Sequence, residues 1–197
     1  MTLFEFLVTE EGIDKISLVE SPAIGVNFLA FKKEQKQTFK ETKKGYLIGA
    51  AMIPDKPIYR VDTGGQEYYG YFSKDTIRKI AELYMEKARQ KDWNVEHATD
   101  VEGVILIESW IVEGEDKATR AGLNVPDGTW IVGVKVANEE VKKDILEKGS
   151  IKGFSIEGLF KTRPVTEQLR KVVEDKIEQA LLSKVEEKVR WMVGGTE

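Results

Sequence analysis

The sequence predicts an α+β domain with a mainly antiparallel sheet, followed by a helical tail. Short apolar runs of strand length recur between clusters of turn residues, which is typical of antiparallel strands. Two amphipathic helical patterns interrupt these strands, and one longer helical pattern ends the chain. With 197 residues, of which 41% are hydrophobic, the chain can bury one core of ordinary size.

The first half of the chain contains three expected strands. Residues 3–8 form a short strand, and Pro22 interrupts the segment after it because proline lacks an N–H donor. The lysine-rich segment 31–45 is predicted to be a solvated loop. The apolar run 46–53 does not alternate, which indicates a strand buried on both faces. An aromatic strand is expected at 68–72.

Capping residues mark both helices of the expected domain. Ser73 is a candidate N-cap for an amphipathic helix over 74–90. Asn138 is the corresponding candidate for a short helix over 139–148, and Gly149 follows its end. The sequence therefore places one helix in the middle of the domain and one near its end.

The remaining elements are a hairpin, two strands and the tail. Residues 93–98 and 104–112 are predicted to pair as a hairpin. Residues 130–136 and 151–160 are expected to be strands. In the tail, apolar residues recur every fourth position over 165–192, so a long helix is expected that packs on its own domain, self-associates or binds another protein.

Composition excludes several classes of function. A net charge of −4 argues against a nucleic-acid-binding surface. No apolar stretch approaches the roughly 20 residues of a membrane span, and the N-terminus does not resemble a signal peptide. The chain has no cysteine and a single histidine, so no metal site and no cofactor are predicted. An intracellular protein without nucleic-acid or membrane partners is expected.

Ser155 is the candidate nucleophile. It lies in the run Gly153-Phe154-Ser155-Ile156-Glu157-Gly158, where strand alternation puts Ser155 and Glu157 on one face. The flanking glycines allow another chain segment to approach closely. A serine on a strand is more often structural than catalytic, so a base must also be found.

His97 is the one histidine and therefore the one candidate for a histidine general base. In the predicted hairpin, Glu108 interrupts an apolar row and lies opposite or diagonal to His97, where its carboxylate would orient the imidazole. Glu157 competes for this third position, and Asp175 in the tail is a further alternative.

Four segments of the chain together carry a family resemblance. They are, in order, Ser17-Leu18-Val19-Glu20-Ser21-Pro22-Ala23-Ile24, the run from Gly49 to Arg60, Glu96-His97, and Gly153 to Gly158. This ordered set resembles the XkdF-like phage serine proteases, which are relatives of prohead proteases and of herpesvirus assemblin.

The resemblance implies an assemblin-like fold, in which a small, mainly antiparallel β-barrel is surrounded by helices, plus a long C-terminal helix. Residues 1–163 would be the protease domain and 164–197 an assembly or packing element. His97 and Ser155 match the family's catalytic pair, whereas the third member, Glu108, is not transferred securely. The resemblance implies a serine endopeptidase that cuts phage scaffold and major capsid protein, and itself, inside the assembling prohead in the host cytoplasm.

Two other classes of protein are weighed against this one. The first is a catalytically silent capsid-assembly protein of the same fold. The second is an unrelated binding domain, in which Ser155 and His97 would lie far apart.

Overall fold

The structure is a computed structural model that describes residues 2–24, 29–30 and 45–165. Their strands form two open sheets. The six-stranded sheet contains β1 (Thr2–Val19), β4 (Ile58–Val61), β5 (Glu67–Tyr71), β6 (Trp93–Val95), β7 (Thr99–Asp100) and β10 (Gly153–Pro164). The four-stranded sheet contains β2 (Leu29–Ala30), β3 (Tyr46–Met52), β8 (Val104–Ile111) and β9 (Trp130–Val136).

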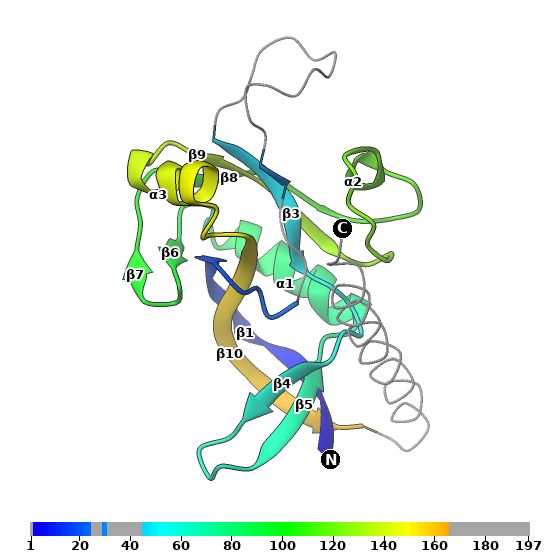
Figure 1. Ribbon diagram of the computed structural model, residues 1–197. Coiled ribbons are helices and arrows are strands. Elements are labelled where there is room, and N and C mark those ends of the chain that lie inside the picture. Colours follow the sequence, from blue (N-terminus) through cyan, green and yellow to red (C-terminus); the bar gives the residue numbers. More distant parts are fainter. Residues whose placement is uncertain (1, 25–28, 31–44, 166–197) are drawn as a thin grey trace, which may run out of the picture.

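Strand β1 is the centre of the larger sheet. It pairs antiparallel with β10 from Phe4 to Val19, and the two strands run side by side through the molecule (Figure 1). Its first residues, Thr2 to Glu5, pair in parallel with β5, and Ile16 to Leu18 near its end pair in parallel with β6. The first and last described strands therefore hold the sheet together.

The helices begin at the residues predicted from their capping signals. The Ser73 hydroxyl accepts a hydrogen bond from the backbone N–H of Thr76 and starts α1 (Lys74–Glu86). Asn138 caps α3 (Glu139–Lys143), which continues into the π-helical turn η1 (Asp144–Lys148) and ends at the predicted Gly149. A short helix, α2 (Lys117–Arg120), forms in the segment after β8.

The main core lies between the two sheets and α1. This helix contacts β1 of the larger sheet and β8 and β9 of the smaller one. Tyr84 of α1 packs edge-on against Trp130 of β9, and Trp93 of β6 packs edge-on against Phe154 of β10. All seven residues of β3 are buried, as its apolar run predicts.

The predicted barrel surrounded by helices is wrong. The described strands form two sheets that do not close on themselves, and the helices are few and short. The physical reason is that the buried strands β3 and β9 pair with each other, and β9 pairs with β8, to make a second sheet where a barrel would continue the first. Strands β8 and β9 of this second sheet contact α1. The expected long C-terminal helix falls on residues 166–197, which lie outside the described residues, as does most of the loop expected at 31–45.

The predicted hairpin between 93–98 and 104–112 is also wrong. β6 pairs with β1 and β7, whereas β8 pairs with β9 in the other sheet. The strand expected at 3–8 extends instead to Val19. No described helix is long and apolar enough to span a bilayer.

Candidate active site

His97 sits at the tip of a tight turn between β6 and β7. The backbone N–H of Ala98 donates to the Val95 carbonyl at 3.1 Å, which closes the turn. Its two central residues, Glu96 and His97, have φ values of 54° and 55°. Positive φ at both positions is the requirement of a type I′ turn, which is usually met by Asn-Gly. Glutamate and histidine adopt it here against their backbone preference.

Contacts with β1 hold this turn in place. The Glu96 N–H donates to the Leu18 carbonyl at 3.0 Å, and the Glu96 carboxylate accepts from the backbone N–H of Glu20 at 2.6 Å. His97 Nδ1 lies 2.8 Å from the hydroxyl oxygen of Ser17. The imidazole is therefore fixed against the C-terminal end of β1.

Ser155 lies on β10 and faces the same part of β1. Its partner in the β1–β10 register is Ser17. The two glycines of the motif allow the close approach that was predicted. A Cβ on Gly153 would lie 2.5 Å from Cγ of Pro22, and one on Gly158 would lie 2.9 Å from Cα of Ile13. The glycines thus let β1 and the segment after it pack closely on the strand that carries Ser155.

Ser17 lies next to both His97 and Ser155. Directly opposed residues of an antiparallel pair project to one face, with Cβ atoms about 4.5–5.5 Å apart. Ser155 and Ser17 are such a pair, and Ser17 contacts His97. Ser17 therefore links the two candidates, because it is the register partner of Ser155 and lies in contact with His97.

Two further polar residues complete this group. Asn94 on β6 is the parallel register partner of Ser17. Its amide nitrogen donates to the carboxylate of Glu157 at 2.7 Å. We call these five residues the polar cluster: Ser17, Asn94, His97, Ser155 and Glu157. Glu157, an alternative for the third catalytic position, thus joins the cluster through Asn94.

Glu108 lies elsewhere, on β8 of the smaller sheet. Its carboxylate forms an ion pair with Lys117, whose ammonium group lies 3.9 Å from the ring centroid of Trp110. Burial, together with the Glu108 charge and a hydrogen bond to it, raises the pKa of Tyr46 above its usual value. The hairpin that placed Glu108 opposite His97 does not exist, so its catalytic role loses that support. Asp175 lies outside the described residues.

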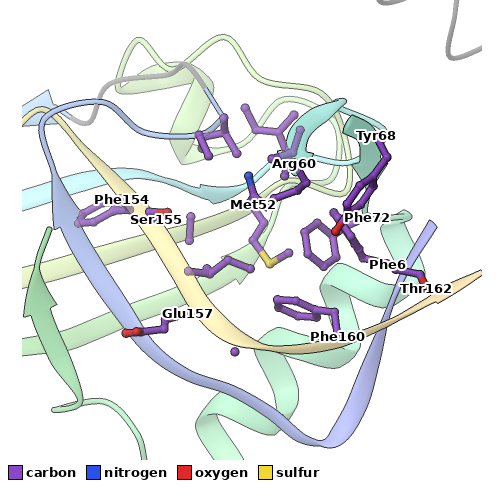
Figure 2. Close-up of a pocket in the computed structure, with 17 residues that line it drawn as sticks. Phe6, Met52, Arg60, Tyr68, Phe72, Phe154, Ser155, Glu157, Phe160 and Thr162 are labelled. Atoms are coloured by element: carbon purple, nitrogen blue, oxygen red, sulfur yellow. The ribbon is translucent and has the colours of Figure 1, made fainter. Parts of the chain in front are cut away.

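A cavity of about 310 Å³ adjoins Ser155. Its lining is mostly apolar and aromatic, and it includes Phe6, Met52, Ile58, Tyr68, Phe72 and Phe160. Figure 2 shows these aromatic rings gathered on one side of β10, whereas the Glu157 carboxylate points away from them. The cavity can accept an apolar group next to Ser155.

Sequence reasoning missed Ser17 and Asn94 as site residues. Ser17 lies in the run Ile16–Val19, where a single serine between apolar residues carries no local signal of function. The available hint was its presence in the first of the four segments that resemble the phage proteases.

Comparison with known proteins identifies the family of the chain but assigns no catalytic residue. Residues 49–163 match the family described as "Putative phage serine protease XkdF". No curated protein and no solved structure matches the chain. The matched region spans more than half of the 197 residues and includes both His97 and Ser155. The chain therefore belongs to the XkdF family of phage serine proteases.

Proposed function

We propose that this protein is a serine endopeptidase that processes scaffold and capsid protein, and itself, during maturation of a phage prohead in the host cytoplasm. Ser155 is the nucleophile and His97 the general base. The observation that carries the proposal is the placement of both residues beside Ser17 in the larger sheet. The family membership supplies the reaction class.

The proposed reaction proceeds through an acyl-enzyme. Ser155 Oγ attacks the peptide carbonyl carbon while its proton passes to His97 Nε2. The C–N bond then breaks, and the imidazolium returns this proton to the leaving nitrogen. Water then attacks the resulting ester and gives a proton to His97 Nε2. The acid is released as this proton returns to Ser155 Oγ.

Accessibility distinguishes the two serines of the pair. Ser155 is only partly buried and borders the cavity, whereas Ser17 is completely buried. A nucleophile must reach a substrate carbonyl, so Ser155 suits that role. We further propose that residues 1–163 form the protease domain and that 164–197 serve assembly or packing.

Two assays test this function. The full chain is expressed with scaffold and major capsid proteins of its phage, and products are followed by intact mass spectrometry. We expect cleavage by the wild type and none by Ser155→Ala. In parallel, a fluorophosphonate probe should label the wild type on Ser155 and leave Ser155→Ala unlabelled, because the probe reacts with an activated serine.

Ser150→Ala is the matched control. Ser150 precedes β10, and its hydroxyl donates to the Asp144 carbonyl at 3.1 Å, so this hydrogen-bond partner is not a member of the polar cluster. This variant should cleave and be labelled like the wild type. If wild type and Ser155→Ala give the same products and the same labelling, the protease proposal is wrong, and a capsid-assembly protein of the same fold becomes the better reading.

A further inference from the structure

The hydroxyl group of Ser17 is buried in the protein, where packing alone does not require a polar group. Its side chain is 0% exposed, and its oxygen lies 2.8 Å from His97 Nδ1. Complete burial prevents it from attacking a substrate. Any influence of Ser17 on the site must therefore pass through the imidazole that it contacts.

The proton positions on His97 decide what that contact does. A neutral imidazole has one N–H, and the other nitrogen accepts. If Nε2 is to take the Ser155 proton, the N–H must be on Nδ1, where it donates to Ser17 Oγ. In that arrangement the Ser17 hydroxyl proton needs an acceptor of its own, because a buried unpaired donor is costly.

Asn94 offers that acceptor. Asn94 is 3% exposed, and its side-chain oxygen has no hydrogen-bond partner among the described residues. Asn94 and Ser17 are register partners on neighbouring parallel strands, about 4.8 Å apart. The hydroxyl proton of Ser17 can reach this oxygen by a small side-chain rotation or through one bridging water.

Glu157 fixes the orientation of the Asn94 amide. An ionised carboxylate only accepts hydrogen bonds, so the group 2.7 Å from it must be the amide nitrogen. The Asn94 oxygen is thereby directed away from Glu157. Donors then run in one direction, from His97 Nδ1 to Ser17, from Ser17 to Asn94, and from Asn94 to the Glu157 carboxylate.

We propose that Ser17 is the positioning residue of this site. It holds His97 in the Nδ1–H tautomer, and the Asn94–Glu157 pair secures the Ser17 hydroxyl in the orientation that accepts from Nδ1. This inference rests on the proposed function, because the tautomer matters only if Nε2 receives the Ser155 proton. The group that orients His97 is then the buried, neutral hydroxyl of Ser17. The Glu157 carboxylate acts on His97 only through Asn94 and Ser17.

The single histidine makes a direct test feasible. The chain is prepared without a histidine tag and with ¹⁵N-labelled histidine, so that every imidazole signal belongs to His97. Spectra recorded above about pH 8, where an ordinary imidazole is neutral, report which ring nitrogen carries the proton. We expect Nδ1–H in the wild type and a shift toward Nε2–H, the form favoured by an imidazole without an orienting partner, in Ser17→Ala.

Kinetics supply the second readout. Ser17→Ala should lower kcat by about 10- to 100-fold with KM unchanged, which is part of the contribution that general base catalysis makes. Ser17→Thr keeps the hydroxyl and should restore the Nδ1–H tautomer and most of kcat. A purely structural role for Ser17 predicts no change in tautomer.

Glu157→Gln is a second variant for the case that Ser17→Ala does not fold. Glu157 is only partly buried, so this change should disturb the fold less. It removes the charge at the end of the chain of donors, and we expect a smaller shift in the same direction. If both variants keep the wild-type tautomer and kcat, the role of Ser17 is wrong, even if Ser155→Ala is inactive. If the wild type does not cleave but the tautomer shifts as expected, the orienting contact stands and the protease function fails.

Discussion

The backbone at Glu96 and His97 is held in a conformation that L-amino acids avoid. Left-handed φ costs of the order of 1 kcal/mol or more for each such residue, because Cβ crowds the backbone. Two consecutive residues bear this cost here, with φ of 54° and 55°. The cost is offset by the hydrogen bonds of the turn to Leu18 and Glu20 of the β1 end. The result is an imidazole aimed at Ser17.

Replacing His97 with asparagine separates stability from activity. Asparagine tolerates left-handed φ better than histidine does, which compensates for the lost contact with Ser17. We expect His97→Asn to unfold in urea within about 1 kcal/mol of the wild type, while cleavage and probe labelling disappear. A loss of more than about 3 kcal/mol would mean that the imidazole itself holds the turn together.

The glycines of β10 give a second prediction at this scale. A methyl group on Gly153 would meet the Pro22 ring at 2.5 Å, and one on Gly158 would meet the Ile13 backbone at 2.9 Å. Gly153→Ala and Gly158→Ala should each lower the free energy of unfolding by about 1–3 kcal/mol, as overpacking does. Gly64→Ala is the control, because the nearest atom to its Cβ, Oδ1 of Asp62, would lie 3.3 Å away, a looser contact than at either glycine of β10. Equal urea midpoints for all three variants would contradict this.

Among the elements, β10 carries the proposed nucleophile and also forms one wall of the cavity. Ser155 borders the cavity from β10, and Phe160 of the same strand contributes an aromatic ring to it. A substrate held along this strand would place an apolar side chain in the cavity, close to the bond that is cut. Cleavage sites should therefore have a large apolar residue near the scissile bond, which sequencing of the product termini would reveal.

Ala23 allows the cavity to be narrowed at an exposed position. It lines the cavity but is exposed to solvent, so a larger side chain there spares the core. Ala23→Trp should slow cleavage at sites with large apolar residues by about tenfold, comparable to one misfitting group in a pocket. Labelling by a small fluorophosphonate should stay at the wild-type rate. Unchanged cleavage at those sites would show that the cavity does not bind substrate.

Patterns among neighbouring residues predicted most of the individual helices and strands. They did not predict which distant strands pair with each other. The buried run of β3, the strand β9 and the caps Ser73 and Asn138 depend on neighbouring residues. The hairpin prediction failed because two adjacent apolar runs suggest mutual pairing, yet β8 pairs with β9. His97 and Ser155 could be predicted from their residue types and from the family resemblance. Ser17 could not, because only the pairing of β1 with β10 brings it opposite Ser155.

At the scale of the whole molecule, the fold depends on β1. Six of its apolar residues are buried: Leu3, Phe6, Ile13, Ile16, Leu18 and Val19. Burial of each such side chain contributes about 1.5–3 kcal/mol. Their loss would remove about 9–18 kcal/mol of burial free energy, before the entropy of ordering the strand is subtracted, whereas a typical domain has about 5–15 kcal/mol of net stability. The region that matches the family, 49–163, does not include this strand.

Truncation tests this dependence. A chain that begins at residue 45 keeps the whole family match but lacks β1, and we expect it to show no cooperative urea transition and no dispersed amide NMR signals. A chain that ends at residue 165 keeps both β1 and β10 and should unfold like the full-length protein. A folded chain without residues 1–44 would show that the smaller sheet and α1 suffice.

The pairing of β1 with β10 has a consequence for synthesis. A ribosome makes β1 first and β10 last among the described strands, so the serine emerges long after the imidazole and its contact on β1. Under the proposed chemistry, a nascent chain has no proteolytic activity until its final strand has left the exit tunnel and docked. Translation itself would thus delay activity until the domain is complete, and a partly made copy could not digest its neighbours.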